Sequence, residues 1–540
     1  MVKIDETCKI PKVGTIQPSS AERRDDPNAS DLPFTKRVAS FCVSAIGALM
    51  LALVVWISLI TVFREGQNSE QVKILLQIFL FAAALVAIFL SKPVIAKVLN
   101  RLSPRRALLS VGFILIALGL VARIVFSVFD YLPTSDPESF FSNATSLLQT
   151  RMLSNPAYIA EFPFLFAYNA LLAGMFKLTG SGLHGIIILN SAFDALAALG
   201  VGQLIFLLSA SHKWRVVGSV FWWISPFNII FCAISLPVIV VNALIIIGLV
   251  LIVYLFKNIG DLKRTFFLSV LVSFVLAAED AFRPITIITV IGILIYYVIY
   301  LLKHHQHKLL RNCILSFLII AILNAVLGHG WQQVVNSATG LPANTNKQGW
   351  SIYVGSNYKS SGGWNREDSD HEASVLKEFD GDYSRAFDIL QREGIYRWKQ
   401  LGPIKAMVLM VRKFIRLTGN NQNMIYNLQG SFPYFKEHGL QFKLMVVMCA
   451  VYWFIMLAFT VCLFLARRRV KKLDFIGFLS IITIGLILAF MAVEVASRYF
   501  TVFFPAFTVF AVMGLKRTLE AFMGRFVPAH QVSCECDIRP

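Results

Sequence analysis

Long apolar runs recur along the chain and are separated by shorter polar segments. A run of roughly 18 residues or more is long enough to cross the hydrocarbon core of a bilayer as one α-helix. The pattern therefore predicts an all-α, polytopic membrane protein. We expect about twelve transmembrane helices, at 38–63, 73–91, 107–129, 184–209, 216–234, 236–256, 265–282, 284–302, 312–328, 443–466, 474–493 and 499–516.

Composition agrees with a membrane protein and argues against a nucleic-acid-binding one. Of the 540 residues, 56% are hydrophobic and 15% are charged, whereas soluble domains are about 25% charged. A net charge of +19 would suggest a nucleic-acid partner if the protein were soluble. In a membrane protein, Lys and Arg instead gather in the cytoplasmic loops. We therefore expect contact with membrane lipids and none with nucleic acid.

The basic residues of the short loops give the orientation. All of these loops lie on one side of the membrane if the N-terminus is cytoplasmic, from Arg23 and Arg24 before the first helix to "RRRVKK" at 467–472. Both termini are then cytoplasmic, and we expect a multi-pass protein of the plasma membrane. The two long polar segments, 130–183 and 329–442, are then outside.

One apolar segment must not span for this orientation to hold. The stretch "AYIAEFPFLFAYNALLAGMFKLTG" at 157–180 is apolar enough to be taken for a transmembrane helix. Counting it as one would reverse every later loop and place "RRRVKK" outside. We therefore predict an amphipathic or re-entrant element at the outer membrane surface.

These patterns divide the chain into six parts. Residues 1–37 are polar and predict a disordered cytoplasmic tail without a cleavable signal peptide. Two extra transmembrane helices and a basic cytoplasmic loop follow. The parts in order are 1–37, the extra helices at 38–106, a core at 107–328 that includes the external loop 130–183, a large external loop at 329–442, C-terminal helices at 443–516, and a cytoplasmic tail at 517–540.

Acidic and basic residues collect at the predicted outer ends of the helices. "FDYLPTSDPESFF" at 129–141 carries three acids, "AAEDAFRP" at 277–284 carries two acids and an arginine, and "VEVASRYF" at 493–500 carries Glu494 and Arg498. Glu494 and Arg498 are four residues apart and would share one face of a helix. One interpretation is an interfacial ion pair that anchors a helix end. The convergence of three clusters on one surface favours an active site.

Such a site has the groups for transfer chemistry on a lipid-linked substrate. An arginine at the membrane boundary can hold a phosphate by a forked, charged contact. A neighbouring carboxylate can act as a general base towards an acceptor hydroxyl. Arginine also neutralises the charge that develops on a departing phosphate.

Several stretches resemble the GT-C membrane glycosyltransferases, and most closely the bacterial protein O-mannosyltransferase and aminoarabinose transferase group. They are "FDYLPTSDPESFFSNATSL", "EFPFLFAYNALLAGMFKLTG", "AFRP", "YVGSNYKSSGGWNREDSD" and "VEVASRYFTVFFP". The resemblance extends over roughly residues 107–516. It implies a GT-C fold and transfer of a sugar from a polyprenyl-phosphate donor to an acceptor hydroxyl on the extracytoplasmic side. The two extra helices at 38–91 depart from this pattern.

The resemblance also implies roles for individual residues. Asp136 would be the catalytic base, with Asp130 as the second choice. "SDPE" also fits a helix start, so Asp136 serving only as a helix cap is the competing interpretation. The donor contacts that it implies are Arg283 and Arg498 on the phosphate, Glu494 orienting Arg498, and Tyr499 lining the pocket. The charge pattern itself adds Glu279 from the "AAEDAFRP" cluster, and Lys413 from the basic side of an amphipathic surface helix at 402–417.

The expected partners are a polyprenyl-phosphate sugar donor and an acceptor protein, wall polymer or glycolipid. Asp136 and Glu138 flank Pro137 like a DxD metal motif, but Glu replaces the second Asp and no His is near. A divalent metal is therefore an alternative that we do not expect. The sugar, the acceptor and the number of donor phosphates stay open.

Two other functions remain as alternatives. A transporter or flippase with about twelve helices would show a repeat between its halves and a midplane site on broken helices, and no half-length repeat is visible. A ligase or polymerase of lipid-linked glycans would need a histidine in the second long loop. His329, His371 and His438 keep that alternative open.

Overall fold

The computed structural model describes residues 34–65, 105–180, 182–303, 306–346, 348–418, 424–467 and 474–523. These ranges contain α-helices and short 3-10 helices, and no β-strand. The predicted span 73–91 and the predicted disordered tail lie outside the described residues. The protein is an all-α, multi-pass integral membrane protein by the length and apolar character of its helices.

Ten helices are long and apolar enough to cross a membrane. An eleventh span is formed if α8 and α9 are counted together, with a bend of 54° between them. Every predicted span except 73–91 corresponds to one of these. The elements are α1 (Phe34–Glu65), α3 (Arg105–Ile124) with η1 (Val125–Val128), α7 (Leu183–Ser209), α8 (His212–Trp223), α9 (Pro226–Cys232), α10 (Val238–Lys257), α11 (Leu262–Phe282), α12 (Thr286–Lys303), α13 (His307–Thr339), α20 (Gly439–Arg467), α21 (Phe475–Ala492), and η3 (Ser497–Phe503) with α22 (Phe504–Met523).

The bend between α8 and α9 has a local cause in the sequence. Ser225 precedes Pro226 and has an extended conformation, with φ −59° and ψ 120°. Proline disfavours the helical conformation in the residue before it and donates no backbone hydrogen bond. The predicted straight span at 216–234 is therefore two shorter helices.

The first long polar segment folds into short helices. They are α4 (Asp136–Thr150), α5 (Pro156–Glu161), η2 (Pro163–Leu165) and α6 (Phe166–Thr179). The stretch 157–180 is thus broken rather than continuous. Its longest piece, α6, has 14 residues, or about 21 Å of helix, which is less than the ~30 Å of a bilayer core.

The second long polar segment is also helical. It holds α14 (Gly349–Gly355), α15 (Arg366–Glu378), α16 (Tyr383–Thr418), α18 (Asn427–Ser431) and α19 (Pro433–Glu437). In addition, α13 continues to Thr339, well past its predicted end at 328. The helix α16 breaks at Gly402, whose φ of 64° and ψ of 171° are not helical, just before Pro403.

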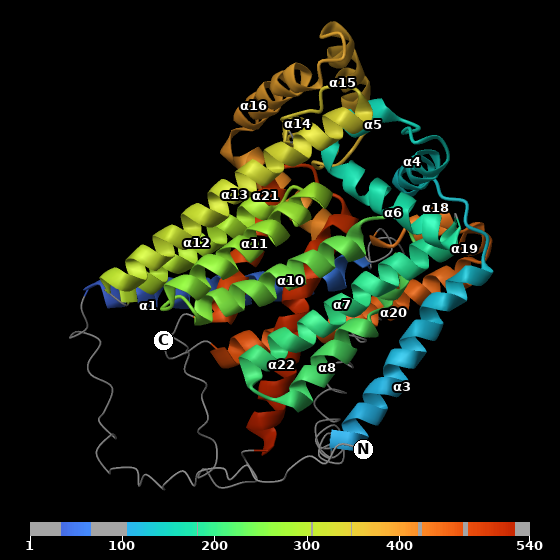
Figure 1. Cartoon of the computed structure of the whole chain (residues 1–540). Helices are drawn as coiled ribbons and strands as arrows, with labels where there is room; N and C mark the ends of the chain where they lie inside the picture. Colours follow the sequence, from blue (N-terminus) through green and yellow to red (C-terminus); the bar gives the residue numbers. More distant parts are fainter. Residues whose placement is uncertain are drawn as a thin grey trace, which may run out of the picture.

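Both polar segments gather at the same end of the helix bundle (Figure 1). There α4 and α5 lie near α14 and α15, and α18 and α19 lie beside the end of α3 (Figure 1). The core of the bundle is rich in aromatic side chains, such as Trp453 against Phe500 and Phe507. The contact of α20 with α22 is close, because a Cβ on Gly514 would lie 1.9 Å from the Phe459 carbonyl oxygen. This packing holds η3, which carries site residues, against the bundle.

A buried ion pair joins three helices inside the bundle. Arg123 on α3 pairs with Asp194 on α7, and both side chains are fully buried. The indole Nε1 of Trp222 on α8 donates to Asp194 at 2.7 Å. Arg123 therefore belongs to the core and not to the polar clusters of the outer surface.

Asn190 on α7 makes hydrogen bonds to neighbouring elements of the bundle. Its Oδ1 accepts from the Tyr168 hydroxyl at 3.1 Å, and its Nδ2 donates to the carbonyl oxygen of Ile234 at 3.2 Å. Asn190 and Asp194 thus both fix helix positions through buried polar contacts.

Candidate functional site

Asp136 is the first residue of α4, as the "SDPE" pattern predicts, and Pro137 follows in the first turn. The preceding residue, Ser135, has φ 63° and ψ −136° and makes no side-chain capping bond. The carboxylate of Asp136 does not serve the helix either. It is directed at Arg498, so helix capping is not the role of this side chain.

Arg498 lies in η3, directly after the break that follows α21. Its Nη2 lies 2.5 Å from the Asp136 Oδ2. Its Nη1 donates to the Tyr426 hydroxyl at 2.9 Å. The Asp136 and Arg498 side chains are 34% and 19% exposed, so this ion pair lies in a half-buried, accessible site.

A second arginine lies next to the first. Arg283 follows α11, and its guanidinium lies over the Tyr499 ring at 4.7 Å from the ring centre. Arg498 approaches the same ring at 5.7 Å. Among the described residues no carboxylate forms an ion pair with Arg283. The two half-buried guanidinium groups approach the same ring, and only one of them forms an ion pair with a carboxylate, so together they can hold an added anion.

Glu494 does not lie on one helix face with Arg498, and that prediction is wrong. Residues 493–496 are not helical, because α21 ends at Ala492 and η3 begins at Ser497. The Glu494 backbone N–H instead donates to the Ser351 carbonyl oxygen at 2.6 Å. Burial raises the pKa of the Glu494 carboxyl, while the nearby charge of Arg498 opposes that rise. The direct partner of Arg498 is Asp136.

Lys413 is fully buried, and its amine is not free to contact a ligand. The Nζ donates to the Gly355 carbonyl oxygen at 2.9 Å and lies 5.2 Å from the centre of the Trp398 ring. Burial lowers its pKa to about 7, against the opposing charge of Glu494. The residue fixes α14 against the second half of α16. The exposed side of that half carries apolar residues such as Ile404 and Met407 together with the basic Lys405 and Arg412.

The remaining predicted acids have other surroundings. Asp130 and Glu138 are exposed, and no ion pair joins either to another described residue. Asp280 accepts a hydrogen bond from the Thr286 hydroxyl at 3.0 Å. Of the acids considered for the base, only Asp136 contacts an arginine of this site.

The structure adds a carboxyl pair that the sequence did not reveal. Glu161, at the end of α5, shares a hydrogen bond with Glu372 of α15. Burial raises the pKa of Glu161 to about 7, and burial together with the charge of Glu161 raises the pKa of Glu372 to about 9. The two long polar segments therefore meet through a pair that holds a proton near neutral pH.

The sequence could have singled out Glu161 as a candidate site residue, but it could not have singled out Glu372. Glu161 stands alone in the apolar stretch "AYIAEFPFLF", where a charge needs a reason. Glu372 stands in "NREDSDHEAS", among several acids of similar appearance. Tyr426, the second partner of Arg498, also had no local signal.

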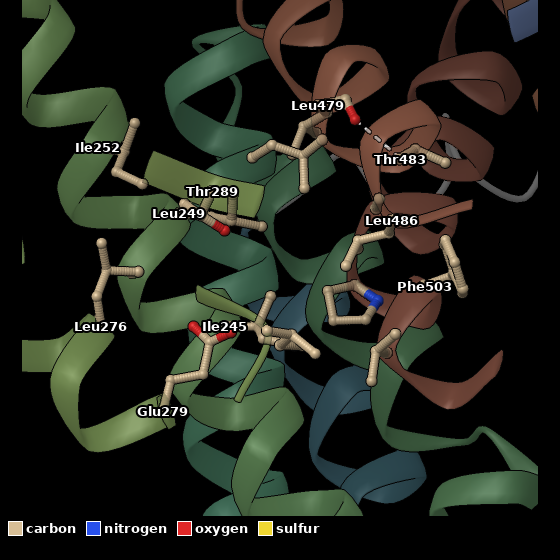
Figure 2. A pocket seen from close by; sticks show the side chains of 16 residues that line it. Ile245, Leu249, Ile252, Leu276, Glu279, Thr289, Leu479, Thr483, Leu486 and Phe503 are labelled. Carbon is tan, nitrogen blue, oxygen red and sulfur yellow. Dashed lines mark hydrogen bonds between the residues drawn. The ribbon is translucent and has the colours of Figure 1, made fainter. Parts of the chain in front are cut away.

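An apolar slot opens among α10, α11, α12, α21 and α22 (Figure 2). Its empty volume is about 520 Å³, which includes the space at its open side. Phe503 of η3 lines it and lies 5.9 Å from Phe490, which stacks on Tyr499. One aromatic layer therefore separates the slot from the two arginines. We call this pocket the slot below.

The described residues contain no group of three or more His, Cys, Asp or Glu side chains placed to hold a metal ion. The histidines of the second long segment also have separate surroundings. His371 lies 2.8 Å from Glu393, and the His438 Nδ1 lies 3.0 Å from the Tyr434 carbonyl oxygen. They do not join the Asp136 site through any described contact.

No family model and no curated protein matches this chain. The function must therefore be argued from the chemistry of the site.

Proposed function

We propose that the protein is a membrane glycosyltransferase that takes a sugar from a polyprenyl-phosphate donor. The observation that carries the proposal is the 2.5 Å contact of Asp136 with Arg498 beside Arg283, which has no carboxylate partner among the described residues. A base and an anion site lie together, as transfer from a phosphate-linked sugar requires.

The proposed reaction exchanges one bond for another at the anomeric carbon of the sugar. The acceptor hydroxyl attacks that carbon, and Asp136 takes the hydroxyl proton. The bond from carbon to phosphate oxygen breaks, and its electron pair leaves with the lipid phosphate. Arg283 and Arg498 then hold a phosphate of greater negative charge, which is a stabilisation that grows along the reaction.

The slot supports a lipid-linked donor in preference to a soluble one. Its walls are almost wholly apolar, and residues from Ile245 to Ile252 on α10 span about 10 Å of its length. In this proposal the hydrocarbon chain of the donor packs against these apolar walls. In this proposal the site faces the outside of the cell membrane and both termini are cytoplasmic, as the loop charges predict.

The test is chemical and uses the purified full-length protein in nanodiscs. Candidate polyprenyl-phosphate sugars are added, and release of free polyprenyl phosphate and transfer to an acceptor are followed by mass spectrometry. We expect release by the wild type and at least ~100-fold less by Asp136→Asn. A transporter or flippase would move the donor without releasing lipid phosphate. Absence of release with every donor would refute the proposal.

A further inference from the structure

Tyr426, the residue directly before α18, is the second partner of Arg498. The Arg498 Nη1 donates to its hydroxyl at 2.9 Å, whereas the Nη2 is paired with Asp136. This hydrogen bond lies in exposed surroundings, and Tyr426 itself is 44% exposed. A group that approaches Arg498 from solvent therefore meets this hydroxyl as well as the guanidinium.

The Tyr426 hydroxyl has one hydrogen-bonding function left. A guanidinium only donates, so Arg498 uses a lone pair of the hydroxyl and leaves its proton. Among the described residues, no other hydrogen bond involves this hydroxyl. The O–H group can therefore donate to a ligand while it accepts from Arg498. A hydroxyl that already accepts from a cation is also polarised towards donation.

Two residues that the charge pattern placed at the donor site do not share this position. Glu279 is 3% exposed and lines the slot (Figure 2). Lys413 is buried, and its Nζ donates to the Gly355 carbonyl oxygen. In the described part of the chain, neither residue contacts Arg498 as Tyr426 does.

Contacts of α18 fix Tyr426 relative to Asp136. The segment 132–134 donates hydrogen bonds of 2.9 and 3.0 Å to the carbonyl oxygens of Ser431 and Gly430 in α18. Asp136 follows this segment closely in the chain, and Tyr426 stands directly before α18. The base and the hydroxyl are therefore held near each other although they come from the two separate polar segments.

The charge of Arg498 decides which ligand suits this pair of donors. A guanidinium favours an anion, and the anionic group of the proposed donor is its phosphate. Hydrogen bonds to a charged acceptor are roughly twice as strong as those between neutral groups. A neutral hydroxyl also adds a donor without competing for the charge of the arginine, as the Asp136 carboxylate does.

We propose that Tyr426 donates a hydrogen bond to the phosphate of the lipid donor while its oxygen accepts from Arg498. This inference rests on the proposed function and adds a donor-binding residue to it. The phosphate then meets a charged donor and a neutral donor that are bonded to each other. Because the leaving phosphate gains negative charge, the hydrogen bond from the hydroxyl strengthens as the sugar departs.

The test measures the Kd of farnesyl phosphate for the purified full-length protein in nanodiscs. Tyr426→Phe keeps the ring and removes the hydroxyl, and we expect about 10- to 100-fold weaker binding, the effect of one hydrogen bond to a charged group. Tyr396→Phe removes the hydroxyl of a tyrosine that is 63% exposed on α16, and this control should bind as the wild type does. Thermal unfolding of each variant checks that the fold is intact.

A second variant separates a direct contact from support of Arg498. Tyr426→O-methyltyrosine keeps an oxygen that accepts from Arg498 but has no proton to donate. We expect it to bind farnesyl phosphate as weakly as Tyr426→Phe does. Binding as tight as that of the wild type would show that Tyr426 only positions Arg498, and the inference would be wrong.

Two further results would count against the inference in different ways. If Tyr426→Phe binds as tightly as the wild type, the contact does not exist, although release of lipid phosphate by the wild type would leave the proposed function standing. If the wild type binds no farnesyl phosphate, this inference fails together with the lipid-donor proposal.

Discussion

The carboxylate of Asp136 and the guanidinium of Arg498 are separated by 362 residues in the chain and by 2.5 Å in the structure. The contact engages the Asp136 oxygen that would accept a proton and the Arg498 nitrogen that would bind the donor phosphate. While the two groups are paired, the Asp136 Oδ2 and the Arg498 Nη2 are each occupied by the other and are less available to an acceptor hydroxyl or to a phosphate. A bound donor phosphate would exchange one partner for the other and free Asp136 to accept a proton.

This exchange predicts opposite effects of Asp136→Asn on two measurements. Sugar transfer should fall by at least ~100-fold, because Asn cannot accept a proton. Donor affinity should rise by several-fold, because Asn no longer competes for Arg498. Turnover and the Kd for farnesyl phosphate check the two effects. Weaker donor binding would mean that Asp136 holds Arg498 in place for the phosphate instead of competing with it.

Replacement of Arg498 should act mainly on donor binding. Arg498→Ala removes one desolvated phosphate contact, which costs on the order of 2–5 kcal/mol. Arg498→Lys should recover only part of the affinity, since lysine lacks the forked geometry. Arg366→Ala, which removes an exposed arginine paired with Asp370, is the control. Unchanged affinity in Arg498→Ala would remove this residue from the donor site.

The Glu161–Glu372 hydrogen bond should make stability depend on pH. Both carboxyls have a pKa raised by burial, to about 7 and about 9. Between pH ~4.5 and 9 the folded state therefore binds more protons than the unfolded state. The stability falls over that range, with the Glu161 contribution lost by about pH 7 and the Glu372 contribution by about pH 9. We expect the thermal midpoint of the wild type to fall by several degrees between pH 6 and 9.

The variant Glu372→Gln should show a smaller fall, because an amide does not ionise. Lys413 acts in the other direction in both proteins, since its lowered pKa of about 7 makes stability rise with pH above 7. Its contribution cancels when the two curves are subtracted. Equal slopes for the wild type and Glu372→Gln would show that the carboxyl pair does not control this dependence.

The buried Arg123–Asp194 pair should matter for folding and not for donor contact. Asp194→Leu leaves the Arg123 charge buried alone, which costs about 3–5 kcal/mol. The double variant Arg123→Met/Asp194→Leu should regain most of that loss, because it leaves no charge behind. Thermal unfolding in detergent measures both. A double variant no more stable than Asp194→Leu would show that the charge is not the cause.

Membrane orientation can be tested at two exposed positions. Ser374 lies on α15 in the second long segment, and Lys263 lies at the start of α11. In a background in which Cys8, Cys534 and Cys536 are replaced by serine, Ser374→Cys should react with an impermeant maleimide in intact cells. Lys263→Cys should react only after the cells are permeabilised. Labelling of both positions in intact cells would overturn the orientation.

The spans were predictable because they depend on local composition. A run such as 238–257, with a mean hydropathy of 3.1, has few alternatives to a membrane helix. The bend at Ser225 is also local and follows from Pro226, but the length of the run concealed it. The predicted end of α13 at 328 was too early, because the apolar run ends there but the helix continues through polar residues to Thr339.

The sequence predicted several residues of the site but not which of them contact each other. Local sequence placed Asp136 at a helix start and Arg498 near a helix break. It could not show that they meet, because that contact depends on how the first polar segment packs on η3. The pairing of Glu494 with Arg498 failed because it assumed a helix through 493–496. Lys413 has the sequence of a surface residue, and only the packing of α14 buries it.

The ion pair inside the bundle has a consequence for biosynthesis. Arg123 enters the membrane on α3, but Asp194 is synthesised 71 residues later, or about 4–14 s later at ordinary translation rates. During that interval α3 must hold an unpaired arginine, at an insertion cost of about 2.5–3.5 kcal/mol. The rest of the segment, with a mean hydropathy of 2.5 over 111–128, is apolar enough to insert in spite of it. The apolar side chains of α3 thus offset the cost of the unpaired Arg123 until α7 is inserted and Asp194 pairs with it.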